Sequence, residues 1–166
     1  KNPLQVVRAL DAVRDLPWTC AMLGDGPLRP AVQAEIERLG LGERIDLPGW
    51  VSTDDVLRAF RASDILFMPS LSEGLPVVGV QAAALGLALV VSRVGGWSDV
   101  VDEGRNGFMI DPQDVAGFAA VLRRLLSDPR ALQVFRQESR ALAAKFDMET
   151  IVAQYEQVLA EASRVA

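Results

Sequence analysis

The chain has 166 residues, half of them apolar, which suits one globular domain with a substantial core. Its net charge of −5, without a basic stripe, argues against nucleic acid as the main partner. Because it has no histidine and a single cysteine, Cys20, the composition excludes a Ser-His-Asp triad, an internal disulfide and the usual zinc sites.

No segment reaches the ~18 uninterrupted apolar residues that a membrane-spanning helix needs. The longest apolar stretch, 76–91, contains Gln81 and two glycines, and is better explained as a buried helix followed by a buried strand. The chain begins with Lys1-Asn2-Pro3 and shows no charged-then-apolar leader. We therefore expect a cytoplasmic protein, with Cys20 as a plain core thiol.

Helical and strand patterns alternate along most of the chain. In order, we expect a helix at 3–13, a strand at 18–23, a turn at 24–27, a helix at 29–39, a strand at 44–47 and a helix introduced by the capping-box pair Ser52 and Asp55. There follow a strand at 64–68, a loop at 69–76, a helix at 77–85 ended by Gly86, a strand at 87–91, a turn at Gly95-Gly96 and a strand at 108–110. The last third is helical.

This alternation predicts an α/β fold, a Rossmann-like parallel sheet with helices on both faces and a helical C-terminal third. The strand at 87–91 shows no alternation of apolar and polar residues, as expected when both of its faces are covered. Ligands of such sheets bind at the carboxyl ends of the strands. The loops to inspect are therefore 24–27, 47–51, 69–76 and 92–99.

The segment 69–82 combines a polar, glycine-containing loop with the start of an apolar helix. The first amides of that helix lack partners within it, and together with the helix dipole they form an anion site that suits a phosphate. Gly74 lets a ligand approach the backbone closely, and Glu73 can accept hydrogen bonds from sugar hydroxyls. On these residues alone, a solvated turn is the simpler interpretation.

The order of residues in this segment resembles the signature of glycosyltransferase family 4, also called glycosyltransferases group 1, which has the GT-B fold. The family motif is Pro-Ser, a spacer, Glu-Gly-Phe-Gly/Pro, and a second Glu before Ala-Met-Ala-x-Gly. The matching residues here are Pro69-Ser70, Glu73-Gly74-Leu75-Pro76 and Ala82-Ala83-Ala84-Leu85-Gly86. Further matches follow in the family's order at Lys1-Asn2-Pro3, 23–28, 45–51, 62–65, 95–101, 104–108 and Asp111-Pro112.

The resemblance implies a role for each matching residue of the loop. Glu73, the first glutamate of the family's pair, is expected to contact the donor sugar as the catalytic carboxylate. The donor's diphosphate and sugar are expected to bind the backbone of Gly74, Leu75, Pro76, Val77 and Val78. Pro76 has no N–H, so the amides of Leu75, Val77 and Val78 would be the donors. Lys1 matches a family lysine that pairs with the diphosphate.

The resemblance also implies where the ribose and the base would bind. Gln81 stands where the family's second glutamate holds the ribose, which makes a variant of its E-x7-E pattern. The Gln81 amide can bond ribose hydroxyls, but without the charge that strengthens such bonds. The alternative is a glutamine packed against its neighbours. Gly49, Trp50 and Val51 match the turn that reads the base, and Trp50 would lie either against the base or in the core.

By the same resemblance, residues 1–166 form a single nucleotide-sugar-binding domain, the C-terminal half of a GT-B enzyme. The N-terminal acceptor domain and the first strand of this half, with an arginine ahead of Lys1, are expected upstream. The whole enzyme is expected to be a retaining glycosyltransferase of the hexosyltransferase type, and the fragment alone to be inactive. We expect no metal and no cofactor beyond the nucleotide-sugar substrate. Peripheral membrane contact through the missing half stays open.

Three alternatives also stay open. One is a non-catalytic GT-B-like binding module, in which Gln81 marks a lost donor affinity. Another is a sugar-nucleotide epimerase on the same architecture, and the third is a plain flavodoxin-like fold with some other ligand. The base, the sugar, the acceptor and the pathway cannot be derived from these residues. We further expect an exposed apolar surface on the helix 148–159, and hence weak self-association.

Overall fold

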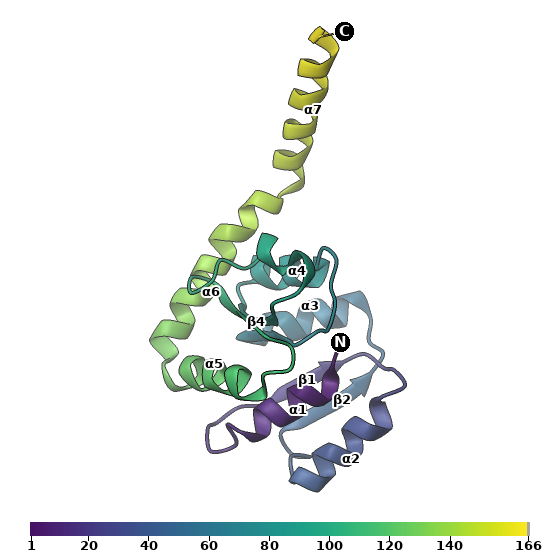
Figure 1. The fold of residues 1–166 in the computed structure, drawn as a ribbon, viewed down its shortest axis with the longest axis vertical. Helices are drawn as coiled ribbons and strands as arrows, with labels where there is room; N and C mark the ends of the chain where they lie inside the picture. Colours follow the sequence, from purple (N-terminus) through teal and green to yellow (C-terminus); the bar gives the residue numbers. More distant parts are fainter. Residues whose placement is uncertain (166) are drawn as a thin grey trace.

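The computed structural model describes residues 1–165, and Figure 1 shows their arrangement. The strands are β1 (Cys20–Leu23), β2 (Ile45–Gly49), β3 (Ile65–Met68), β4 (Ala88–Ser92) and β5 (Gly107–Ile110). The helices are α1 (Pro3–Asp11), α2 (Arg29–Leu39), α3 (Thr53–Arg61), α4 (Val77–Leu85), α5 (Val115–Ser127), α6 (Pro129–Ala143) and α7 (Met148–Val165). Two short 3₁₀ turns, η1 (Gly95–Asp99) and η2 (Ala144–Phe146), complete the order.

The described strands all pair in parallel, as their alternation with helices predicts, but they form two sheets and not the single sheet we expected. One sheet contains β1 and β2, and the other has the order β3-β4-β5. The two sheets nevertheless share one hydrophobic core, to which Ile45 of β2 and Val90 of β4 both belong. The predicted α/β class with parallel strands is confirmed. The division into two sheets was not predicted, because an apolar run shows which segments are extended, while pairing depends on which strands become neighbours in space.

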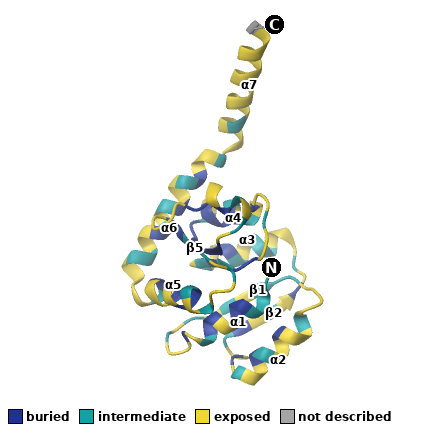
Figure 2. Ribbon diagram, viewed as in Figure 1, coloured by how far each residue is buried: buried dark blue, intermediate teal, exposed yellow. Residues whose placement is uncertain are grey.

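The three-stranded sheet is covered on both faces, as predicted from the uninterrupted apolar run of β4. All five residues of β4 are buried. Ala88 and Val90 pack into the core that contains α1 and α5, whereas Leu89 and Val91 pack into a second core that contains side chains of α3 and α4. This alternation is the period of two that a strand imposes on its side chains. Figure 2 shows the buried residues concentrated between these layers.

The two-stranded sheet is covered on one face. Ile45 of β2 is buried in the core formed with α1 and α2. Ala21 of β1 and Asp46 of β2, which alternate with core residues along their strands, are both exposed. Helices on both faces are therefore confirmed for β3-β4-β5 but not for β1-β2.

Local signals in the sequence fix several boundaries. The observed α2 and α4 have the predicted bounds, and each is followed by a glycine in the left-handed conformation, Gly40 or Gly86. The predicted capping box begins α3: Ser52 Oγ accepts from the Asp55 amide at 3.1 Å, and Asp55 Oδ2 accepts from the Ser52 amide at 3.2 Å. Trp18 lies outside β1, contrary to expectation: its carbonyl accepts from the Arg44 guanidinium at 3.1 Å, and its indole N–H donates to the carbonyl of Val13 at 2.9 Å.

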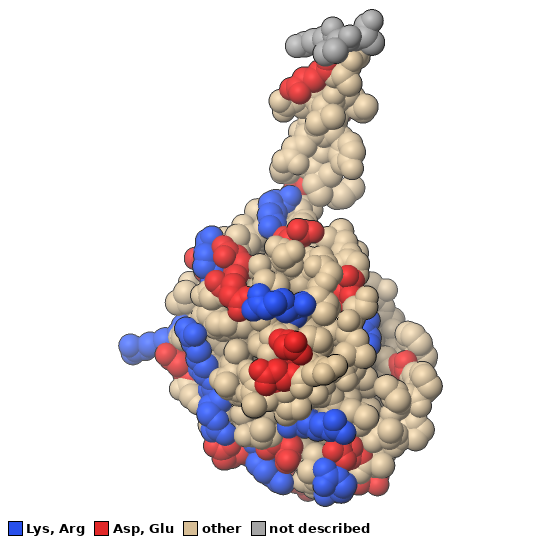
Figure 3. Space-filling view, in the orientation of Figure 1, with Lys and Arg blue, Asp and Glu red and all other residues tan. Residues whose placement is uncertain are grey.

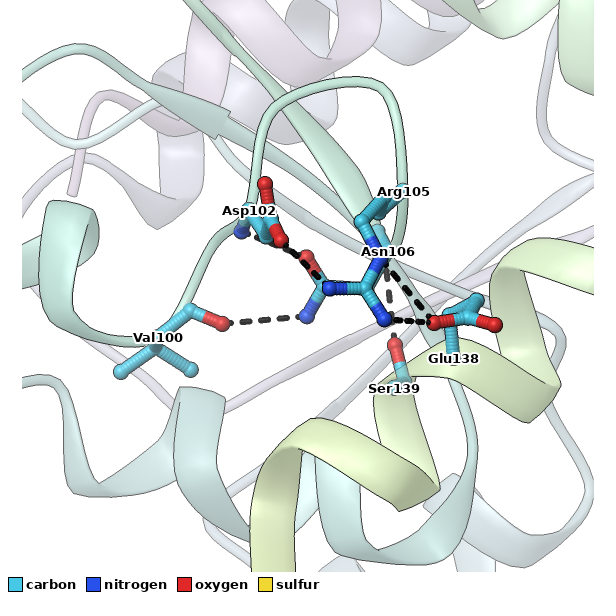
Figure 4. A network of polar contacts seen from close by, with 6 residues as sticks. All are labelled: Val100, Asp102, Arg105, Asn106, Glu138 and Ser139. Atoms are coloured by element: carbon cyan, nitrogen blue, oxygen red, sulfur yellow. Dashed lines mark hydrogen bonds and ion pairs between the residues drawn. The ribbon is translucent and has the colours of Figure 1, made fainter. Parts of the chain in front are cut away.

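A polar network ties the connection before β5 to α6 (Figure 4). Asn106 is completely buried, and its side-chain oxygen accepts from the Asp102 amide at 2.8 Å. Arg105 pairs with Asp102 at 3.0 Å and with Glu138 of α6. Ser139, the next residue of α6, is also completely buried. This network holds α6 beside the sheet.

The last helix, α7, extends away from the rest of the chain (Figure 1). Its described side chains include a stripe at helical spacing, Met148, Val152, Tyr155 and Leu159, that is 48–70% exposed. The predicted exposure of apolar surface on 148–159 is thus confirmed. Among the helices of residues 1–165, none has the combined length and apolarity that a bilayer crossing requires.

Candidate functional site

The carboxyl ends of the parallel strands bring the four predicted loops to one edge of the molecule. The loops after β1 and β2 are joined by the Gly24 amide, which donates to the Gly49 carbonyl at 2.8 Å. The loops after β3 and β4 are joined by the Gly96 amide, which donates to the Gly74 carbonyl at 3.0 Å. This edge is where a doubly wound α/β fold binds its ligands.

Glu73 lies in the loop between β3 and α4 and pairs with the first residue of the chain. Lys1 Nζ is 2.5 Å from Glu73 Oε1. The Glu73 side chain is 10% exposed and that of Lys1 is 64% exposed. Burial acts to raise the pKa of Glu73, but the Lys1 ammonium and the nearby Ser70 hydroxyl outweigh it and hold that pKa below its ordinary value. The sequence therefore predicted two residues that the fold brings into direct contact.

Unpaired backbone donors follow Glu73 in the chain, at the beginning of α4. Pro76 precedes the helix without a side-chain cap. Within residues 1–165, the amides of Leu75 and Val78 have no hydrogen-bond partner, whereas the amide of Val77 already donates to the Leu75 carbonyl at 3.0 Å. Of the three amides expected to meet a ligand, two are thus free, and the helix dipole adds positive potential beside them.

The base of this loop contains a buried polar group without a partner. Ser70 is completely buried, and its hydroxyl lies near Glu73 but makes no hydrogen bond of normal geometry within the described part of the chain. Its carbonyl, by contrast, accepts from the hydroxyl of Ser92 at the end of β4. Buried hydroxyls usually have a hydrogen-bond partner, and a bound ligand or water would supply one for Ser70.

The turn after β2 forms a second part of the edge. Gly49 has a φ of 79° and is buried, and Trp50 beside it is 81% exposed. Val51 is half-buried. Trp50 is thus available to a flat ligand and does not pack in the core. Arg29, which the sequence analysis did not single out, donates to the Leu47 carbonyl at 2.7 Å and lies against Gly49.

Gln81 lies on the exposed side of α4, one helical turn after Val77. Val77 is 60% exposed, and Gln81 is also exposed. Gln81 is therefore not a glutamine packed against its neighbours, which was the alternative interpretation. Its amide is free to reach a ligand above the first turn of the helix.

The charges around this edge are mixed. On the face drawn in Figure 3, basic and acidic side chains lie side by side. Among residues 1–165, no group of three or more acidic, histidine or cysteine side chains is arranged to hold a metal ion. Lys1 and the backbone amides at the start of α4 contribute positive potential at the site.

One residue packed against α4, Trp97, was not singled out by the sequence analysis. It belongs to η1, where only a turn was expected, and it is completely buried against Gly79 of α4. A signal was available in the sequence. Glycine inside a helix costs roughly 1 kcal/mol relative to alanine, so Gly79 pointed to a close approach by another group.

These residues define an α/β domain with a candidate anion site at the carboxyl ends of its strands. The family model described as "Glycosyl transferases group 1" matches residues 1–128. The 2-deoxystreptamine glucosyltransferase of Streptomyces kanamyceticus is 32% identical over 165 residues, which cover 96% of this chain and 42% of that protein. Sulfoquinovosyl transferase SQD2 of Arabidopsis thaliana is 32% identical over 130 residues, covering 76% of this chain and 25% of that protein.

Solved structures agree with this match. HepE of Anabaena, in a complex with UDP, has a TM-score of 0.82 and 25% identity, and the match covers 93% of this chain and 44% of HepE. The C-terminal domain of LpcC, a glycosyl transferase group 1 protein of Francisella tularensis, has a TM-score of 0.80 at 22% identity over 87% of this chain and 78% of that domain. The chain therefore belongs to the glycosyl transferases group 1, which confirms the resemblance and the fold class. It spans less than half the length of the two relatives named above.

Proposed function

We propose that this chain is the donor-binding half of a retaining glycosyltransferase and binds a nucleotide-diphosphate sugar at the carboxyl edge of its strands. The observation that carries the proposal is the convergence of Lys1, Glu73 and the free amides of Leu75 and Val78 on one loop. Family membership supports it, and so do the complexes of HepE with UDP and with UDP-glucose, at 25% identity to this chain.

Each part of the edge suits one part of such a donor. The amides of Leu75 and Val78, with the helix dipole, would hold the diphosphate, and Lys1 would move from Glu73 to pair with it. The Glu73 carboxylate would then accept hydrogen bonds from the sugar hydroxyls. Gln81 would bond the ribose, since its exposed amide carries both a donor and an acceptor.

The base would lie on the turn after β2. Gly49 lets the base approach the backbone, and the half-buried Val51 borders the same turn. The exposed Trp50 indole offers a flat surface against which a base can stack. Arg29 fixes the turn by its hydrogen bond to the Leu47 carbonyl.

The reaction would exchange one bond at the anomeric carbon of the sugar. The bond to the diphosphate oxygen breaks, the bond to the acceptor oxygen forms on the same face, and the acceptor proton leaves with the diphosphate or a neighbouring base. The residues at the edge would mainly stabilise the charge of the departing diphosphate, an effect that grows when water is excluded. The proposal includes no metal, because the Lys1 ammonium and the backbone amides would supply the positive charge and dipoles that stabilise the diphosphate.

The chain would need a further part of the same protein to complete this reaction. β1 and β3 belong to separate sheets of parallel strands over one core, which leaves a place for one more parallel strand between them. A strand from an upstream segment would join the two sheets, and an N-terminal domain would hold the acceptor. The 166-residue chain alone would then bind donor weakly and transfer no sugar.

Calorimetric titration of the chain with UDP, GDP, ADP and their sugar conjugates tests this proposal. We expect one base to be preferred. We also expect Glu73→Gln to weaken binding of the sugar conjugate by about tenfold, but binding of the bare nucleotide by much less. Glu149→Gln, on the exposed α7, is the matched control. Equal effects of the two substitutions would contradict the proposal. So would the absence of binding heat with every nucleotide at millimolar concentration.

A further inference from the structure

The side chain of Trp97 occupies the space that a side chain at position 79 would need. A Cβ atom built on Gly79 would lie 2.4 Å from Cζ3 and 3.0 Å from Cη2 of the Trp97 ring. The first distance is shorter than real Cβ contacts, so any larger residue at 79 would have to displace the indole. Trp97 and Gly79 are therefore matched in size, and their contact sets the separation of η1 from α4.

The same turn is in direct backbone contact with the donor loop. A Cβ atom on Gly95 would lie 1.6 Å from the Glu73 carbonyl oxygen, and one on Gly96 would lie 2.5 Å from that of Gly74. Neither position has room for a side chain. The Gly96 amide uses this closeness to donate to the Gly74 carbonyl at 3.0 Å.

The direction of the Gly74 carbonyl determines the direction of a ligand-binding amide. A trans peptide bond is planar, so the Leu75 N–H points opposite to the Gly74 C=O. Because Gly96 holds that carbonyl on the side of η1, the Leu75 N–H is held on the opposite side, where it has no partner within residues 1–165. The position of η1 therefore orients one of the two free amides of the loop.

Trp97 holds η1 in place mainly by its shape. It is completely buried, and its indole N–H makes no hydrogen bond within the described part of the chain. Its carbonyl accepts from the amides of Val100 and Val101 at 3.0 Å and 2.8 Å, and both of these residues are buried in the same core. The turn is thus anchored on one side in the core and on the other by the contact with Gly79.

We propose that Trp97 is a positioning residue for the donor, which acts by fixing η1 against Gly79 so that Gly95 and Gly96 hold the Glu73-Gly74 backbone. The inference rests on the proposed function, because it names what orients the amide that would receive the diphosphate. If Trp97 only filled the core, a size change at this contact would lower stability without a specific effect on the loop.

The test uses three variants: Gly79→Ala, Trp97→Leu and the double variant that combines them. Each is compared with the separate control variant Gly107→Ala. Gly107 is the matched control, because its Cβ would lie 2.2 Å from the Leu89 carbonyl oxygen, in the β4-β5 pairing. Two readouts are measured at equal temperature: hydrogen exchange of the Gly96 amide and affinity for UDP. We expect Gly79→Ala to speed Gly96 exchange and to weaken UDP binding, each by about tenfold, as the loss of about one hydrogen bond would.

The double variant separates positioning from general damage. Trp97→Leu removes the ring atoms that a Cβ at 79 would meet. The double variant should therefore bind UDP more tightly than Trp97→Leu alone, restoring part of the affinity that Trp97→Leu lost. Trp97→Leu alone introduces no clash, and carries the test if Gly79→Ala does not fold.

Two results are kept distinct. If Gly79→Ala and Trp97→Leu affect Gly96 exchange and UDP affinity no more than Gly107→Ala does, the positioning role is overturned. If the unsubstituted chain binds none of UDP, GDP and ADP, the proposed function fails, while Gly96 exchange still shows whether Trp97 holds the turn against the loop.

Discussion

The Lys1 ammonium and the Glu73 carboxylate form an ion pair of 2.5 Å, although 72 positions separate them in the chain. Lys1 stands just ahead of α1, and Glu73 follows β3, so the pair links the start of the chain to the loop proposed to receive the donor. In the free chain the two groups therefore neutralise each other. We propose that a bound diphosphate takes over the lysine and leaves the carboxylate for the sugar.

Replacing Lys1 with methionine should raise the pKa of Glu73. The ion pair helps to lower that pKa from its ordinary value of 4.5, and without the Lys1 ammonium the influences that remain are burial, the Ser70 hydroxyl and the more distant N-terminal amino group. Because the native pKa is the lower one, the stability that the pair contributes is fully present above pH 4.5 and is lost as the pH falls through the native value. Carbon-detected NMR titration of the Glu73 carboxyl measures the change, and an unchanged pKa in Lys1→Met would contradict this account.

Gln81→Glu should strengthen nucleotide binding. A carboxylate forms stronger, charge-assisted bonds with ribose hydroxyls than a neutral amide does, so we expect a gain of about threefold to tenfold for the preferred nucleoside diphosphate. Ala84→Glu, also on the exposed side of α4, is the control for added charge. A non-catalytic module without a donor site predicts no gain from either substitution, and that outcome would favour the alternative.

The apolar stripe of α7 should cause weak self-association of the chain. Val152, Tyr155 and Leu159 are 48–69% exposed and lie on one side of the helix. Sedimentation velocity over a range of concentrations should show a rising sedimentation coefficient that Tyr155→Ser with Leu159→Ser abolishes. Gln154→Ser, on the same helix, should leave the association unchanged. A clean monomer at high concentration would refute the prediction.

Cys20 should react slowly in the folded chain. Burial raises the pKa of its thiol to about 11, so only ~0.1% is thiolate at pH 8. A thiol-specific disulfide reagent should therefore label the native chain far more slowly than the chain in denaturant, where the pKa returns to its ordinary value. Equal rates in the two states would show that packing against the core does not shield the Cys20 thiol.

Much of the fold could be predicted from local signals. The bounds of α2 and α4 follow from apolar periodicity ended by glycine, and β4 follows from its uninterrupted apolar run. β2 extends two residues beyond the predicted strand, because Leu23 of β1 pairs with Gly49 after a shift of register between Ala21 and Leu23. That extension depends on a neighbouring strand, which a local pattern does not reveal.

The site was predictable in part. The resemblance assigned both Glu73 and Lys1 to the donor site, and the structure brings these two side chains into contact. The hydrogen bond of the Val77 amide to the Leu75 carbonyl and the packing of Trp97 against Gly79 could not be predicted in the same way. Both depend on how the loop and η1 meet in space, and a sequence pattern carries this information only indirectly, through a glycine such as Gly79 inside a helix.

The central claim is that a nucleoside diphosphate binds at the carboxyl edge of the strands. The most direct test follows the backbone amide NMR signals of the chain during titration with UDP, GDP and ADP. The account predicts shifts for one nucleotide, concentrated at 73–78, around Gln81 and at 49–51, with the largest at the free amides of Leu75 and Val78. Shifts confined to other surfaces, or none at millimolar nucleotide, would contradict it.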